Sequence, residues 1–236
     1  MSGSARALTH PLLAERDVRH GFGVRGGGAP SDLWRPRQVH GSRLVVAEGE
    51  PWSEPPPADA VATAQPGRAV GVATADCVPL LLASARGEWV VAVHAGWRGL
   101  AGGVVETAAA FLRARRPEGG WVAVLGPHVG PCCYEIDEPV VAALRPRFGG
   151  DVDDALRPTR PAHWRLDLGR LVRRALSRAG FDPARVGAIP DACTACDGER
   201  FHSHRRDGPR AGRLVHFVVA GSVVGPATLR PLDTNP

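Results

Sequence analysis

The sequence predicts an α/β fold, a sandwich with a mixed sheet, and three observations lead to this prediction. Short and nearly continuous apolar runs are typical of strands that are covered on both faces. Segments with helical spacing lie among these runs, but strands and helices do not alternate strictly. The length of 236 residues fits one large domain, and no feature divides it. We therefore expect residues 1–236 to form a single domain.

The predicted strands are the short apolar runs, most of them in the first half of the chain. They cover residues 42–47, 68–74, 80–84, 89–94, 121–125, 186–189 and 214–220. Most of these runs lack the alternation of polar and apolar residues that marks a strand facing water on one side. We therefore expect a sheet with layers packed on both of its faces.

Three helices are predicted between these strands. Residues 103–116 carry apolar side chains at helical spacing and end in several arginines, which suit a helix C-terminus. Asp137 begins a second helix, with Pro139 in its first turn, where a missing amide proton does no harm. Residues 168–179 form the third, which Gly180 closes.

The composition excludes several classes of protein. The 29 basic residues are all arginine, which rules out lysine Schiff-base and pyridoxal-phosphate enzymes and lysine-dependent nucleotide-binding loops. The net charge is +5, but the arginines are dispersed among acidic residues, so we expect no nucleic-acid partner. No apolar run approaches the roughly 20 residues that span a bilayer, and residues 1–11 lack the pattern of a secretory signal. We expect a cytoplasmic protein with no membrane partner.

Three short segments each place a potential ligand near the end of a strand, followed by a turn. They carry His40 in RQVHGS, Cys77 in TADCVP and His94 in VHAGWRG. Two imidazoles and a thiolate suit zinc, and three protein ligands leave a position open for a water molecule that zinc would activate. The same residues also fit a metal-free site, with Cys77 as nucleophile and His94 as its base. A third interpretation is a packed cysteine beside two locally bonded histidines.

Other polar residues are weaker candidates. Arg205 and Arg206, in RFHSHRRDG, have the geometry to bind phosphate or carboxylate, unless this is a solvated charged loop. Trp97 lies beside a candidate ligand and would wall a pocket for a planar ring, or else pack in the core. Asp76 alternates to the face opposite Cys77, so we expect a structural hydrogen-bonding role.

Two cysteine-bearing segments have less certain roles. The Gly- and Pro-rich residues 125–137 follow a strand and would place Cys133 and Tyr134 near a pocket, or form a rigid connection. CTAC, at residues 193–196, is a lone C-x-x-C and gives only half of a structural zinc site. For Cys196 we therefore expect a packing or loop role.

In order along the chain, QVHG, TADCVPLLL, AVHAGWRGL, LGPHVGPCCYEID and FHSHRRDG resemble the YfiH-like laccase-domain family. Its members are also named polyphenol oxidases or purine nucleoside phosphorylases. The resemblance implies a single-domain α/β/α sandwich with mixed sheets, similar to the catalytic domain of cytotoxic necrotizing factor. The stretch before QVHG is shorter than is usual in the family, which affects one edge of the pocket.

The resemblance also implies roles for particular residues. The metal ligands and catalytic residues of the family fall on His40, Cys77 and His94. The late arginine motif implies an anion site at Arg205 or Arg206, with Arg98 ranked behind them. Cys133 occupies the family's CYE position, and Trp97 or Tyr134 would stack against a substrate base.

The implied activity is zinc-dependent phosphorolysis of adenosine, inosine, guanosine and methylthioadenosine, together with deamination of adenosine. The partners would then be a purine nucleoside and phosphate. One alternative is a copper-dependent polyphenol oxidase, although a conventional multicopper site needs more histidine clusters than this chain offers. The other alternative is an amidohydrolase that uses Cys77 on a cell-wall precursor.

Overall fold

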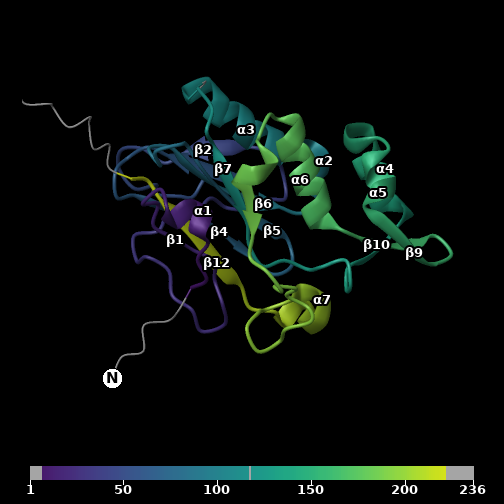
Figure 1. Ribbon diagram of the computed structural model, residues 1–236. Helices are drawn as coiled ribbons and strands as arrows, with labels where there is room; N and C mark the ends of the chain where they lie inside the picture. The colour runs from purple at the N-terminus through teal and green to yellow at the C-terminus, as the bar shows by residue number, and fades with distance from the viewer. Residues whose placement is uncertain (1–6, 117, 222–236) are drawn as a thin grey trace, which may run out of the picture.

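The computed structural model describes residues 7–116 and 118–221 (Figure 1). The strands are β1 (His20–Gly21), β2 (Leu44–Val46), β3 (Ala60–Thr63), β4 (Ala69–Thr74), β5 (Val78–Ala83), β6 (Val90–Ala95), β7 (Val122–Leu125), β8 (Glu135–Asp137), β9 (Leu156–Arg160), β10 (His163–Leu166), β11 (Val186–Ala188) and β12 (Leu214–Val219). The α-helices are α1 (Pro11–Ala14), α2 (Trp97–Gly102), α3 (Val104–Arg115), α4 (Glu138–Phe148), α5 (Asp151–Asp154), α6 (Leu168–Arg178) and α7 (His204–Asp207). Residues 1–6, part of the segment for which we expect no secretory signal, lie outside the described residues.

A six-stranded mixed sheet is the centre of the fold. Its order is β11-β7-β5-β6-β3-β2, with parallel pairs at both edges and antiparallel pairs between them. Every residue of β3, β5, β6 and β7 is buried. The continuous apolar sequences of β5, β6 and β7 predict this burial, whereas β3 was not among the predicted strands. The predicted α/β fold with mixed sheets is therefore confirmed.

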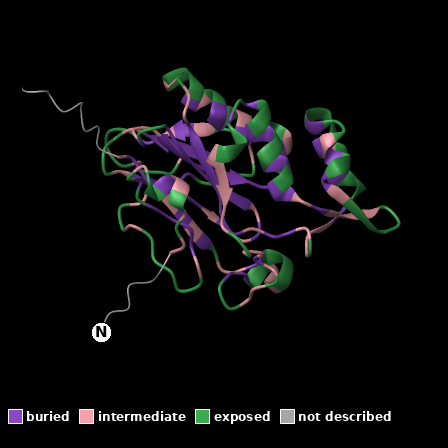
Figure 2. Cartoon of the chain, in the orientation of Figure 1, coloured by how far each residue is buried: buried purple, intermediate pink, exposed green. Residues whose placement is uncertain are grey.

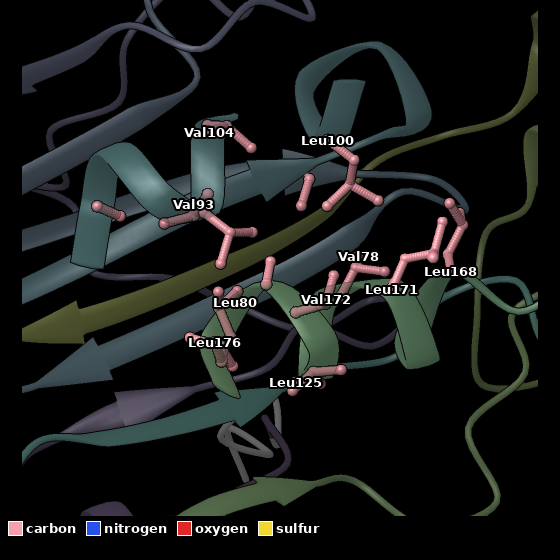
Figure 3. Packing of buried hydrophobic residues seen from close by; sticks show 14 of the residues in the cluster. Val78, Leu80, Val93, Leu100, Val104, Leu125, Leu168, Leu171, Val172 and Leu176 are labelled. Carbon is pink, nitrogen blue, oxygen red and sulfur yellow. The ribbon is translucent and has the colours of Figure 1, made fainter. Parts of the chain in front are cut away.

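Helices cover one face of this sheet. Figure 3 shows Leu171, Val172 and Leu176 of α6 packed toward the sheet among side chains of β5, β6 and β7. The three predicted helices correspond to α3, α4 and α6, and Pro139 lies in the first turn of α4 as expected. The outer faces of these helices are exposed, while the sheet beneath them is buried (Figure 2).

The opposite face differs from the expected α/β/α layering, because a second sheet covers it. β4 and β12 pair with each other instead of joining the central sheet, and β1 completes the order β1-β12-β4. Side chains alternate along β5, so that Leu80 packs under the helices while Leu81 packs against this second sheet. The single turn of α1 also joins this layer, through Leu13.

An exposed sheet lies beside these layers and bears on the site. β8, β10 and β9 form an antiparallel sheet next to α4 and α5, at the right of Figure 1. The sequence did not predict it, because LRPTR and HWRL have neither an apolar run nor strict alternation. The backbone N–H of Leu166 donates to the carbonyl of Tyr134 at 2.9 Å, which fixes Tyr134 at the entrance to β8.

No helix within residues 7–116 and 118–221 combines the length and the apolar character that crossing a lipid bilayer requires.

Candidate metal and substrate site

The antiparallel pairing of β5 and β6 brings two of the three predicted ligands together. Val78 pairs with Ala95, so Cys77, just before β5, comes to lie opposite Gly96 and close to His94. A Cβ on Gly96 would lie 2.8 Å from the sulfur of Cys77 and 3.4 Å from the ring of His40. Glycine in the HAGW motif therefore leaves the space that the Cys77 thiol and the His40 ring occupy.

His40 completes the group. One donor atom each from His40, Cys77 and His94 lies within 4.8 Å of the other two. The imidazole rings of His40 and His94 are 4.8 Å apart between centroids and meet edge to face. His94 is buried, Cys77 is half-buried and His40 is exposed, so the group is closed on one side and open on the other.

Asp59, a residue that the sequence analysis missed, holds two of these ligands. Its carboxylate is fully buried and lies 2.8 Å from Nδ1 of His94. It also accepts hydrogen bonds from the backbone N–H groups of Val39, His40 and Gly41 at 3.2, 2.9 and 2.6 Å. These bonds hold His40 in a left-handed conformation, with φ of 59°, that non-glycine residues rarely adopt. In the sequence, this role was indicated by nothing more than a single carboxylate directly before the apolar residues of β3.

The ionisable residues of this group change one another's pKa values. Burial alone would raise the pKa of Cys77, but hydrogen bonds with His40 and His94 lower it to about 7. Burial alone would lower the pKa of His94, but the contacts with Asp59 and Cys77 raise it to about 9. The pKa of Asp59 lies below its ordinary value because His94 and the backbone N–H groups outweigh its burial. The protein thus favours a thiolate at Cys77, the form that binds metals.

A cavity of about 480 Å³ opens directly above the three ligands. Trp97 and Tyr134 line it, as do three arginines, Arg98, Arg205 and Arg213. The guanidinium of Arg98 lies 4.2 Å from the Trp97 ring centroid, and that of Arg205 lies 5.1 Å from the Tyr134 ring centroid. The cavity therefore combines flat aromatic surfaces with positive charge.

Asp76 fixes the wall of the cavity that carries Arg205. One oxygen of its buried carboxylate accepts a hydrogen bond from the Thr194 hydroxyl at 2.6 Å, and the other accepts one from the backbone N–H of Arg205 at 2.5 Å. Asp76 itself has a φ of 94°, which turns the chain just before Cys77. The predicted hydrogen-bonding role of Asp76 is confirmed, but its expected position opposite Cys77 is wrong, because the positive φ ends the strand alternation and both residues line the same cavity.

The structure thus brings most of the predicted site residues to one cavity: His40, Cys77, His94, Trp97, Arg98, Tyr134 and Arg205. It places Arg206 elsewhere, because this guanidinium donates to the carbonyls of Thr194 and Phe201 and pairs with Asp207. It also places Cys133 outside the cavity lining, with its sulfur 3.3 Å from that of Cys196.

Sequence reasoning also missed Gln38 and Arg213. The amide of Gln38 both donates to and accepts from the backbone of Ala73, at 2.8 and 2.7 Å, and so ties the segment before His40 to β4. Arg213 lines the cavity from just before β12, within the AGR triplet that follows RFHSHRRDG. Its position after a conspicuous arginine motif was the one signal available.

Known proteins that are similar to this chain agree with the family resemblance that its motifs carry. A purine nucleoside phosphorylase of Xylella fastidiosa strain Temecula1 is 42% identical over 200 residues, covering 82% of this chain and 74% of the relative. The protein named adenosine deaminase RL5, from an unknown prokaryotic organism, is 30% identical over 209 residues, covering 84% and 78%. The crystal structure of YlmD from Geobacillus stearothermophilus superposes with a TM-score of 0.82 at 26% identity, covering 94% and 98%. Residues 19–221 match the family described as multi-copper polyphenol oxidoreductase laccase, and the chain therefore belongs to that family.

Proposed function

We propose that the protein is a zinc-dependent purine nucleoside phosphorylase that also deaminates adenosine. The observation that carries this proposal is the group of His40, Cys77 and His94 at the base of a cavity lined by arginines and aromatic rings. The names of the two relatives, a purine nucleoside phosphorylase and an adenosine deaminase, support the same chemistry.

The donor set fits zinc. Zinc binds two imidazoles and one thiolate readily, and three protein ligands are typical of catalytic rather than structural zinc sites. Nδ1 of His94 is engaged by Asp59, which leaves Nε2 for a metal and fixes the orientation of the ring. A zinc ion bound there would supply Lewis acidity and activate a nucleophile at neutral pH.

The cavity fits a nucleoside and an anion. Its volume of about 480 Å³ lies within the range of about 300–1,000 Å³ that is usual for small-molecule sites. Trp97 and Tyr134 offer ring faces on which a purine would stack. Arg98, Arg205 and Arg213 offer the charge and the forked donors that phosphate binding requires.

The residues of this cavity suit two reactions, phosphorolysis and deamination. In phosphorolysis, a phosphate oxygen bonds to C1′ of the ribose while the C1′–N bond breaks, which gives ribose 1-phosphate and the protonated free base. The arginines would hold the phosphate and neutralise its charge during this transfer. In deamination, water adds at C6 of adenine and ammonia leaves, which gives inosine.

A second candidate function rests on the contacts of the His94 side chain, which meets Cys77 on one side and Asp59 on the other. A nucleophile, a base and a carboxylate that orients the base are the elements of a cysteine hydrolase, and the pKa of Cys77 is lowered to about 7. Such an enzyme would cleave an amide through a thioester and would need no metal.

Nucleoside assays with and without phosphate separate these functions. We expect adenosine, inosine, guanosine and methylthioadenosine to yield free base only with phosphate, and adenosine to yield inosine without it. Chelation should stop both reactions, and added zinc should restore them. Chelator-resistant amide cleavage that iodoacetamide blocks would instead establish the cysteine hydrolase. Oxidation of phenols that depends on added copper would establish a polyphenol oxidase.

Replacing Arg205 with alanine is expected to raise the KM for phosphate by about tenfold to a hundredfold, because a charge-assisted hydrogen bond contributes about 1.5–3 kcal/mol. Arg210→Ala is the matched control, since Arg210 is exposed, lies in the same segment and does not line the cavity. Phosphate-independent deamination should change much less than phosphorolysis. Equal KM values for phosphate in the two variants would show that Arg205 does not bind the phosphate.

A further inference from the structure

A second group of potential metal ligands lies outside the cavity and consists of four cysteines. The sulfur of Cys196 lies 3.4 Å from that of Cys132 and 3.3 Å from that of Cys133, and the sulfurs of Cys132 and Cys193 are 3.5 Å apart. All four sulfurs lie within 4.8 Å of one another. The CTAC motif, half a zinc site in the sequence, therefore has its other half in the adjacent Cys132 and Cys133.

The parallel pairing of β7 and β11 brings these two halves together. Beyond the strand ends the ladder continues at His128, which pairs with Cys193. The N–H of His128 donates to the carbonyl of Ala192, and the N–H of Thr194 donates to the carbonyl of His128. Each chain then turns: the N–H of Cys133 donates to the carbonyl of Gly130, and the N–H of Asp197 donates to that of Cys193. One turn therefore presents Cys132 and Cys133, and the other presents Cys193 and Cys196.

We propose that Cys132, Cys133, Cys193 and Cys196 bind a structural zinc ion. Zinc–sulfur bonds of about 2.3 Å in a tetrahedron place neighbouring sulfurs roughly 3.8 Å apart. The separations in this group are close to that value and well above the roughly 2.05 Å of a disulfide bond. Four thiolates complete the coordination shell of zinc, which is the arrangement of structural rather than catalytic sites.

Gly130 contributes to the same site through its backbone. Its N–H donates to the sulfur of Cys193 at 3.2 Å, an interaction that orients a thiolate ligand. A Cβ on Gly130 would lie 3.2 Å from the sulfur of Cys132 and 3.4 Å from Cβ of Cys193. The backbone of this turn therefore lies so close to the sulfurs that a side chain at position 130 would crowd them, and glycine, which has none, fits there.

The ion would join two walls of the cavity. Tyr134 directly follows Cys133, and Thr194, which donates to Asp76, lies inside the CTAC turn. Arg206 donates to the carbonyls of Thr194 and Ala195 and so ties the same turn to α7, which carries Arg205. Zinc at the four cysteines would thus fix the separation of Tyr134 and Arg205 without touching the substrate.

Metal analysis of reduced protein, purified without added metal, tests the site. We expect about two zinc ions per wild-type chain, about one in Cys196→Ser and about one in Cys77→Ser. The four-cysteine site goes beyond the proposed function, and either idea can be disproved while the other stands. Zinc that is lost in Cys77→Ser but unchanged in Cys196→Ser would overturn the four-cysteine site and leave the cavity site standing.

Cobalt substitution of Cys77→Ser tests the site in a chain that retains all four cysteines. A tetrathiolate site should give the intense visible bands of tetrahedral cobalt and strong sulfur-to-metal charge transfer. Cys77→Ser/Cys196→Ser should lose both. If Cys77→Ser binds no cobalt and its four thiols react freely, or if the wild-type chain contains disulfides among these cysteines and no metal there, the proposal is wrong.

Discussion

Cys77→Ser is expected to lower kcat/KM for every nucleoside by about a thousandfold or more, while the chain stays folded. Serine has nearly the volume of cysteine, but its hydroxyl stays protonated at neutral pH and is a poor zinc ligand. The loss of a metal that contributes several kcal/mol to transition-state stabilisation accounts for an effect of this size. Steady-state kinetics with adenosine and inosine, with and without phosphate, measure it.

Three readings on the same sample separate this effect from unfolding. Circular dichroism should match that of the wild-type chain and thermal unfolding should remain cooperative, with a midpoint lowered only by the loss of the bound ion, while the zinc content falls by about one ion per chain. His94→Ala should lose the same ion and the same activity, since His94 lies in the same donor group. A Cys77→Ser variant that turns over nucleosides at the wild-type rate would refute the assignment.

Asp59→Asn is expected to weaken zinc binding by about 10- to 100-fold and to lower the free energy of unfolding by about 3–5 kcal/mol. The buried carboxylate meets the imidazole of His94 and three backbone N–H groups. An amide keeps one accepting oxygen, but its NH₂ group would face donors and find no acceptor among them. Zinc titration and denaturant unfolding measure the two effects.

Excess zinc distinguishes Asp59, which positions the ligands, from the ligands themselves. Saturating zinc should restore much of the kcat of Asp59→Asn but none of that of Cys77→Ser. Asp32→Asn is the matched control, because Asp32 is exposed and does not line the cavity that holds the three ligands. If Asp59→Asn binds zinc as tightly as Asp32→Asn and unfolds at the same denaturant concentration, Asp59 has no role in holding the site.

The central sheet was predictable because burial on both faces leaves a continuous apolar run in the sequence. β5 (VPLLLA), β6 (VVAVHA) and β7 (VAVL) are such runs. α2 was not predicted, because WRGLAG contains two glycines and too few apolar positions to show a helical period. The second sheet was missed as a layer, since a strand's sequence does not say which strand it will pair with.

The same limit applies to the two groups of candidate metal ligands. His40, Cys77 and His94 were recognisable because each stands in a distinct motif at the end of a strand or extended segment. Asp59 and the four cysteines were not, because their partners are set by strand pairing: β3 with β6 for Asp59, and β7 with β11 for the cysteines. Arg205 and Arg206 are adjacent in sequence, and only the fold of α7 separates their roles.

The position of β12 has a consequence for synthesis on the ribosome. This strand, near the end of the described chain, lies between β1 and β4, which are made much earlier. Until residues 214–219 emerge, β1 and β4 have no strand between them, and the face of the central sheet that carries Leu81 lacks part of its cover. The nascent chain would therefore expose this apolar face from the time the central strands pair until residues 214–219 emerge, and in that interval it would be prone to aggregation.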